Sequence, residues 1–232
     1  MLFINPPFGN YISLPYTTPI HGSFTYNSRP GLFGQIFKTL RYSFKYGGWV
    51  NKIGLRNPGL QYAINKYNTN DIISIAILEA NEIPKILDIL PGKQNIELNV
   101  SCPNIEKGVF TKNLSKFINK DRKWCIIKLS PTIDSKLIDD YYKQGFRQFH
   151  CSNTLPVEEG GLSGSVLIPY TIKHITHLKK YNDVTIIAGG GVYNYDVFKS
   201  YLSLGAHHVS ISTILFNPFK LALFYYDFIK SI

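Results

Sequence analysis

Cysteine and long apolar runs are scarce in this sequence. Its three cysteines, Cys102, Cys125 and Cys151, are an odd number at wide spacing, which fits neither a disulfide framework nor a zinc site and indicates a reducing compartment. No segment approaches the roughly 18 uninterrupted apolar residues of a membrane span, and the start "MLFINPPFGN" has no basic region before an apolar run. We therefore expect a soluble, cytoplasmic protein with no membrane segment and no metal site.

Acidic residues are also few, because 15 of them face 25 lysines and arginines, which gives a formal net charge of +10. Such a charge suits nucleic acid or an anionic membrane surface when the basic residues form one tract. Here they are scattered, as in "NKDRK" and "HLKK". The charge therefore favours attraction of small anions, and we expect no nucleic-acid partner.

The length and composition predict a single domain over residues 1–232. Hydrophobic residues make up 44% of the chain, enough for one sizeable core. Short β-rich runs alternate with helical periodicity, which is typical of a parallel sheet built from βα units. Eight such runs predict an α/β fold, a (β/α)8 TIM-type barrel whose chemistry lies on the loops at the C-terminal ends of the strands. The predicted strands are residues 2–5, 19–25, 71–78, 95–101, 124–130, 148–153, 185–190 and 207–213.

Helices are predicted after most of these strands, at residues 80–90, 134–145, 167–180, 194–205 and 217–232. The first unit differs. Between the first two strands lies "PPFGNYISLPYTT", whose prolines and glycine leave no room for a regular crossover helix. We therefore expect a barrel with a reduced first βα unit.

Polar residues at the predicted strand ends suggest a site. Alternate residues of a strand face the same way, so Asn99, Lys128 and Asn153 can converge at the barrel mouth with Cys102 just above. Each has an ordinary alternative. A cysteine near a strand end is often a small buried hydrophobe, and asparagine there is often a turn residue. A lysine that faces inward among apolar residues needs an anionic or electron-rich partner, however.

Glycine-rich turns suggest that partner. Gly189, Gly190 and Gly191 follow the seventh strand, and Ser212 and Thr213 end the eighth. In TIM barrels these two loops often bind phosphate through backbone N–H groups near a helix N-terminus. The turn "GGLSG" at 160–164 can also approach a ligand closely. The placement indicates a phosphorylated cofactor.

Several motifs in this order resemble the dihydroorotate dehydrogenase family, most closely its soluble class 1 members. They are "NKIGLRNPG", "ELNVSCPN", "IIKLSP", "NT" followed by "GGLSG", "AGGG", and "GA" before "ISTILF". The resemblance runs from about Pro19 to the C-terminus. It implies an enzyme that carries flavin mononucleotide (FMN) at the barrel mouth and oxidises dihydroorotate to orotate in pyrimidine biosynthesis.

The resemblance also implies roles for individual residues. Cys102 matches the catalytic base that removes the C5 proton while a hydride leaves C6 for flavin N5, and Lys128 matches the lysine facing flavin N1 and O2. Asn99 would contact both flavin and substrate. The remaining substrate contacts would be Asn51, Ile53, Gly54, Leu55, Asn104, Asn153 and Thr154, and the remaining flavin and phosphate contacts Gly164, Gly190, Gly191, Ser212 and Thr213.

Three departures leave an alternative open. The family's lysine that contacts flavin and substrate falls on Gly22, the first unit is reduced, and the segment between Asn153 and Gly161 predicts a reduced lid. The alternative is a catalytically impaired or repurposed FMN-binding barrel, or a related pyrimidine reductase. The resemblance implies a homodimer, and it leaves open fumarate or a partner subunit passing electrons to NAD as acceptor, with "NKIGLRNPG" favouring the NAD-linked branch.

Overall fold

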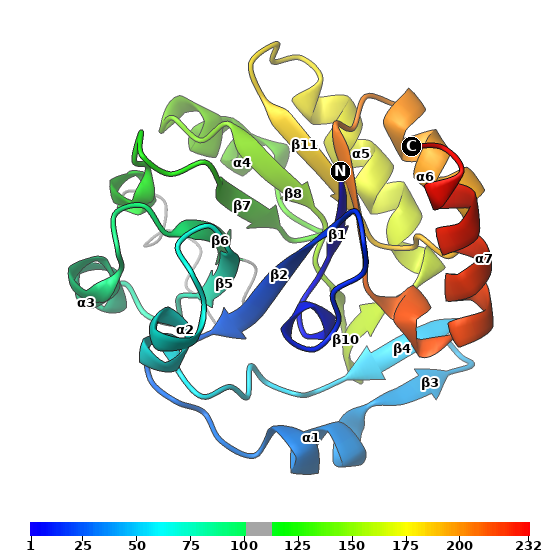
Figure 1. Cartoon of the computed structure of the whole chain (residues 1–232), viewed down its shortest axis with the longest axis horizontal. Helices are drawn as coiled ribbons and strands as arrows, with labels where there is room; N and C mark the ends of the chain where they lie inside the picture. Colours follow the sequence, from blue (N-terminus) through cyan, green and yellow to red (C-terminus); the bar gives the residue numbers. More distant parts are fainter. Residues whose placement is uncertain (101–112) are drawn as a thin grey trace.

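The computed structural model describes residues 1–100 and 113–232 of the chain. Eight parallel strands in these ranges close into a barrel in the order β1, β12, β11, β8, β7, β6, β5, β2 (Figure 1). The strands are β1 (Leu2–Ile4), β2 (Thr17–Phe24), β5 (Ile72–Ala76), β6 (Asn95–Asn99), β7 (Cys125–Leu129), β8 (Gln148–Cys151), β11 (Thr185–Gly189) and β12 (His208–Ile211). Each corresponds to a predicted strand, so the prediction of a TIM-type barrel is confirmed.

Helices cover the outside of the barrel (Figure 1). Five of them match the predicted helical segments, namely α3 (Glu82–Ile89), α4 (Ser135–Lys143), α5 (Ile168–Leu178), α6 (Tyr195–Ser203) and α7 (Pro218–Ile229). Three of these helices, α4, α6 and α7, begin at a side-chain cap: Asp134, Asn194 and Asn217 each accept a hydrogen bond from a backbone N–H in the first turn. The short helix α2 (Leu60–Lys66) and the 3-10 turns η2 (Leu114–Phe117) and η3 (Ser165–Leu167) were not predicted.

The first unit is reduced, as expected. Residues 5–16 are described in full, and their only helix is the 3-10 turn η1 (Phe8–Asn10). Its Asn10 side chain accepts from the backbone N of Gly22 at 2.7 Å and donates to the Gly22 carbonyl at 3.0 Å. Gly9 lies so close to β2 that a Cβ there would be 2.2 Å from the Ile20 carbonyl oxygen. A close backbone contact therefore replaces the first crossover helix.

A second, smaller sheet was missed by the sequence analysis. It is antiparallel and has the order β3 (Arg41–Ser43), β4 (Gly48–Asn51), β10 (Gly160–Ser163) and β9 (Leu155–Val157). Figure 1 places β3, β4 and the unpredicted helix α1 (Leu32–Thr39) along one side of the barrel. The strands are three or four residues long, too short to show a period. The segment after Asn153, expected to be a reduced lid, forms the hairpin β9–β10 that joins this sheet.

Two layers of side chains fill the barrel interior. The layer toward the N-terminal ends of the strands is apolar and consists of Phe3, Ile20, Ile72, Trp124, Ile126 and Ile187. Two residues further along, the same inward face carries polar side chains or glycine, at Asn5, Gly22, Ser74, Glu97, Lys128, His150, Gly189 and Ser210. The upper layer is therefore a polar floor beneath the barrel mouth. None of the helices in residues 1–100 and 113–232 has the length and apolar character of a membrane span.

Candidate active site at the barrel mouth

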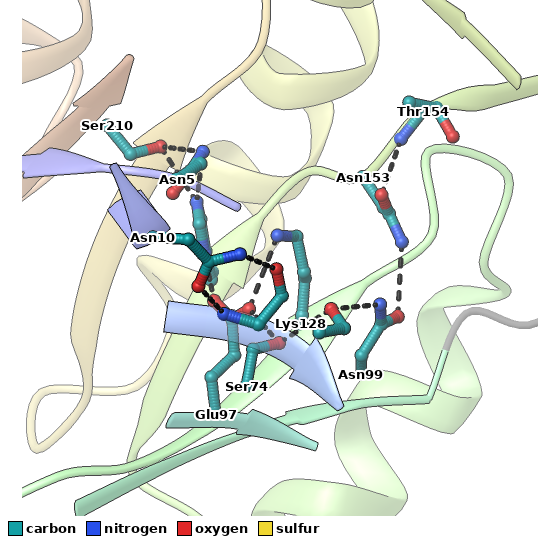
Figure 2. Close-up of polar contacts among 12 residues, drawn as sticks. Asn5, Asn10, Ser74, Glu97, Asn99, Lys128, Asn153, Thr154 and Ser210 are labelled. Atoms are coloured by element: carbon teal, nitrogen blue, oxygen red, sulfur yellow. Dashed lines mark hydrogen bonds and ion pairs between the residues drawn. The ribbon is translucent and has the colours of Figure 1, made fainter. Parts of the chain in front are cut away.

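Glu97 lies at the centre of the polar layer. Its Oε1 accepts from the Ser74 hydroxyl at 2.8 Å and lies 3.3 Å from Lys128 Nζ, and its Oε2 lies 2.5 Å from His150 Nδ1 (Figure 2). Glu97 and His150 are fully buried, and Lys128 is 5% exposed. The inward position of Lys128 was predicted, whereas its carboxylate partner from the neighbouring strand β6 was overlooked.

This arrangement keeps Glu97 ionised. Burial alone would raise the pKa of its carboxyl, but the Lys128 charge, the His150 imidazole and the Ser74 hydroxyl outweigh burial and lower the pKa to about 2. Burial lowers the pKa of His150 below its ordinary value, against the opposing attraction of Glu97. At neutral pH the layer therefore holds a carboxylate, an ammonium and a neutral imidazole.

The hydrogen bonds of His150 fix its tautomer. A carboxylate can only accept, so the imidazole Nδ1–H donates to Glu97 and Nε2 must accept. The Ser210 hydroxyl lies 2.7 Å from Nε2 and donates to it, while Asn5 Nδ2 donates to Ser210 Oγ at 3.0 Å. Gly189 makes room for this pair, because a Cβ there would lie 2.1 Å from Ser210 Oγ and 3.0 Å from His150 Nε2.

A chain of hydrogen bonds leads from this floor to the barrel rim (Figure 2). Ser74 contacts Ser23 Oγ at 2.9 Å, Asn99 Nδ2 donates to Ser23 Oγ at 3.2 Å, and Asn153 Nδ2 donates to Asn99 Oδ1 at 3.1 Å. Asn153 Oδ1 then accepts from the Thr154 N–H at 2.9 Å. The predicted convergence of Asn99, Asn153 and Lys128 is therefore present in the geometry.

The floor opens into a cleft between the loops that follow β8, β11 and β12. Its walls include Asn5, Lys128, Ser152, Asn153, Thr154, Ser163, Leu167, Gly190, Gly191, Ser210, Ser212 and Thr213. The cleft is narrow, with a volume of about 70 Å³, and Thr213 also lines an adjoining cavity of about 400 Å³. Tyr42, Trp49, Tyr193, Phe216 and Lys220 surround that larger cavity. The cleft therefore has a polar floor, and the adjoining cavity has aromatic walls and one lysine.

The glycines of the cleft pack against the start of α5. Gly190 and Gly191 have φ angles of +93° and +77°, which favour glycine. Their Cβ atoms would meet the Leu167 and Ile168 side chains at 2.8 and 2.5 Å. Asn5 Oδ1, on the wall of the cleft, is buried and has no hydrogen-bond partner within the described residues. An unmet acceptor, a lysine and a helix N-terminus suit a ligand with N–H groups and a phosphate.

Comparisons with known proteins now identify the family. The chain matches the family model described as "Dihydroorotate dehydrogenase" over residues 20–223. The chain belongs to this family. It is 29% identical over 216 residues to the dihydroorotate dehydrogenase B (NAD(+)) catalytic subunit of Petrotoga mobilis, covering 78% of this chain and 72% of that protein. The protein of the same name from Malacoplasma penetrans is 29% identical over 220 residues, or 78% and 71% of the two chains.

A solved structure supports the fold. The Eimeria tenella DHODH in complex with ferulenol superimposes with a TM-score of 0.64 at 16% identity, covering 89% of this chain and 72% of that one. The family assignment confirms the resemblance inferred from the motifs. Two of the predicted site residues, Cys102 and Asn104, lie outside the described residues.

Apart from Asn99 and Gly164, the other predicted contacts of this dihydroorotate dehydrogenase family member fall into two groups. Lys128, Asn153, Thr154, Gly190, Gly191, Ser212 and Thr213 line the cleft. The turn at Ile53, Gly54 and Leu55 is not on the described walls of either cavity, and it reaches the site through Asn51. Asn51 Oδ1 lies 3.4 Å from the Ile53 N, and its strand pairs Asn51 with Gly161, which packs against Thr154. Gly164 begins η3 beside Gly191.

Asn57 holds that turn and was missed in the sequence. Its side chain donates to the Leu55 carbonyl at 2.7 Å and to Thr25 Oγ1 at 2.8 Å, and it accepts from the Gly59 N at 2.8 Å. Leu55 has a φ of +56°, unusual for a residue with a side chain, and Gly54 a φ of +67°. Asn57 therefore stabilises this turn.

Gly22 differs from the family for a structural reason. Its φ is +126°, and a Cβ would lie 2.6 Å from the Ser74 carbonyl oxygen, so this backbone does not accommodate a lysine. His21 faces the other side of the strand and stacks on Tyr67 with ring centroids 3.9 Å apart. Position 22 therefore offers no side chain in the place of the lysine that the family resemblance implies.

Proposed function

We propose that this protein oxidises dihydroorotate to orotate with FMN bound in the barrel-mouth cleft and the adjoining cavity. The observation that carries the proposal is the position of Lys128, on the cleft floor below Gly190 and Gly191 and paired with Glu97 at 3.3 Å. Family membership supports the reaction, and the flavin fits the unmet Asn5 acceptor and the glycine turns. Pyrimidine biosynthesis is the pathway that consumes orotate in this family.

The residues of this chain would divide the work in the following way. Gly190, Gly191 and Thr213 would hold the phosphate with backbone and hydroxyl donors near the start of α5. When bound, the flavin accepts the hydride that leaves the substrate. Lys128 would offset negative charge that develops on the ring, because its ammonium is already fixed at the floor of the cleft. Asn99, Asn153 and Thr154 would orient the pyrimidine.

The proposed base is Cys102, on the strength of the motif in which it stands. The other two cysteines are poor candidates. Burial raises the pKa of the Cys125 thiol to about 11, and burial also raises the pKa of Cys151 well above its usual range. Neither thiol would give up its proton readily at neutral pH.

Partners also belong to the proposal. The relatives from Petrotoga mobilis and Malacoplasma penetrans are named catalytic subunits of NAD(+) enzymes, which supports a second, electron-transfer subunit for this chain. We also propose a homodimer and a cytoplasmic location, as the class 1 resemblance implies. Sedimentation of the purified chain, alone and with candidate partners, tests the assembly.

An absorption spectrum tests the central claim. The purified protein should be yellow, and anaerobic dihydroorotate should bleach the flavin band, whereas dihydrouracil should not. Cys102→Ala should keep the flavin but slow bleaching by roughly 10²–10⁴-fold, as expected for loss of a general base. Cys125→Ala is the matched control and should bleach at the wild-type rate. Faster bleaching by dihydrouracil would favour a pyrimidine reductase, and a colourless protein that takes up no FMN would favour a repurposed barrel.

A further inference from the structure

His150 is a buried base to which the proposed reaction assigns no role. It lies at the middle of β8 with no exposed surface, yet its Nε2 faces Ser210, whose side chain lines the cleft. The path from the cleft to the imidazole is therefore a single hydroxyl, 2.7 Å from Nε2. A neutral imidazole so placed can accept a proton that enters from the cleft.

The charges around His150 are balanced only while the cleft is neutral. Among the described residues, the ionisable groups that face it are Glu97 on β6 and Lys128 on β7. Its other neighbours in the barrel, Asn5, Gly189 and Ser210, are neutral. The carboxylate and the ammonium cancel, so the layer has no net charge when His150 is neutral. An added negative charge above Lys128 would upset this balance and favour the imidazolium.

We propose that His150 takes up one proton through Ser210 whenever negative charge forms in the cleft above Lys128. The inference rests on the proposed function, because the reduced flavin would be that charge. The proton comes from the solvent and is relayed by a cleft water molecule, which gives one proton to Ser210 and takes one from the solvent, so that no hydroxide remains in the cleft. The Ser210 O–H bond breaks as a bond forms to His150 Nε2, and Ser210 takes a replacement proton from the water. No group is oxidised or reduced in this step.

The surrounding geometry stabilises the product of this transfer. Nδ1–H already donates to Glu97 at 2.5 Å, so the imidazolium would keep a carboxylate partner. The new Nε2–H would donate to Ser210 Oγ, since the hydroxyl can rotate and accept. Glycine at position 189 keeps both groups in contact, because a Cβ there would lie 2.1 Å from Ser210 Oγ. Every proton of the imidazolium would thus have an acceptor.

The consequence is measurable without turnover. Reduction of the flavin would take up one proton more than the flavin itself requires. For a two-electron couple, each tenfold change in equilibrium is about 30 mV. The midpoint potential of the flavin in the wild-type protein should therefore fall with pH about 30 mV per pH unit more steeply than in a variant without the imidazole. This difference is expected over the pH range in which His150 is neutral before reduction and charged after it.

The experiment is a dye-mediated reductive titration of the FMN-loaded protein at several pH values. His150→Asn should lose the additional slope, and Ser210→Ala should reduce it, because the imidazolium would lack its Nε2–H acceptor. His174→Gln is the matched control. His174 is also a buried histidine, with a pKa lowered to about 4 chiefly by burial, but its Nε2 faces the Ser130 carbonyl away from the cleft. Its replacement should leave the slope unchanged.

The slopes of potential against pH test the inference. It is supported if the wild-type slope is steeper than the slopes of His150→Asn and Ser210→Ala, and if His174→Gln keeps the wild-type slope. If His150→Asn does not hold flavin, the comparison of Ser210→Ala with wild type carries the test. Equal slopes in wild type and in the cleft-side variants overturn the inference and leave the proposed function standing. A protein that binds no flavin under any loading condition overturns both.

Discussion

The two interior layers of the barrel share their strands but differ in what they do. Ile126 and Lys128 are two residues apart on β7, and Ile72 and Ser74 are two apart on β5. The lower residue of each pair packs against apolar neighbours, while the upper residue joins the network around Glu97. A step of two residues along a strand therefore separates the apolar layer, which stabilises the fold, from the polar layer, which holds the charged groups.

The two layers differ in what their stability requires. The apolar layer needs only shape, whereas each polar group in the upper layer needs a partner of the right sign and geometry. Glu97 has three such partners, from β5, β7 and β8. The upper layer should therefore be sensitive to loss of one group, and the lower layer to loss of volume.

The largest effect is expected from Glu97→Gln. It leaves the Lys128 ammonium buried without its counter-ion, and removing one member of a buried pair typically costs about 3–5 kcal/mol. Urea unfolding at pH 7 measures the loss. The matched control is the double variant Glu97→Gln with Lys128→Met, which removes both charges and should regain most of the stability. A single variant as stable as wild type would show that the ion pair is not what holds this layer.

A similar or somewhat smaller loss is expected from Ile126→Ala in the lower layer. This side chain is fully buried, and truncation of a core isoleucine costs about 2–5 kcal/mol through lost burial and the cavity left behind. Ile126→Val should cost about 0.5–1.5 kcal/mol. The flavin potential and its pH dependence should be unchanged in both, because no charge is altered. A shifted potential in Ile126→Val would contradict the separation of the two layers.

Of the two layers, only the upper one should lose stabilisation in acid. The folded pKa of Glu97, about 2, lies below its ordinary value of 4.5. The carboxylate therefore contributes its full stabilisation above pH 4.5 and loses it as the pH falls through about 2, amounting to about 3 kcal/mol. The urea midpoint of wild type should fall over this range, with a smaller fall in Glu97→Gln. Parallel curves for the two proteins would exclude Glu97 as the titrating group.

Sequence reasoning located the barrel but not the network inside it. Short β-rich runs between helical segments predicted all eight barrel strands, because the composition of a strand is a local signal. The pairing of Glu97 with His150 joins residues 53 positions apart on strands that are not neighbours. Nothing in either strand alone indicates that pairing. The inward period of "NIELN" and "QFHCS" places both residues on the interior face, and this was the signal available.

The small sheet and α1 were missed for a different reason. Their stability comes from the rest of the fold, since β4 pairs with β10 over 110 residues away in the chain and α1 buries none of its side chains. Strands of three or four residues leave little periodicity in the sequence, and α1, although amphipathic, buries no side chain completely. The turn at 51–59 was located by resemblance, but its Asn57 support follows only from the fold.

A smaller loss of stability than that of Glu97→Gln or Ile126→Ala is expected at Gly22, where it also tests the departure from the family. Gly22→Ala should cost about 1–3 kcal/mol, because its φ of +126° is unfavourable for any side chain and Cβ would crowd the Ser74 carbonyl. For the same reason, Gly22→Lys should weaken dihydroorotate binding instead of strengthening it, although a lysine there would supply a charge-assisted hydrogen bond in an unstrained strand. Gly34→Ala, with open space around it, is the control and should be tolerated. Urea unfolding and substrate titration of the flavin-loaded variants measure both effects. Tighter dihydroorotate binding by Gly22→Lys at undiminished stability would mean that β2 relaxes easily, and that the polar layer is less tightly fixed on this strand than on β6 to β8.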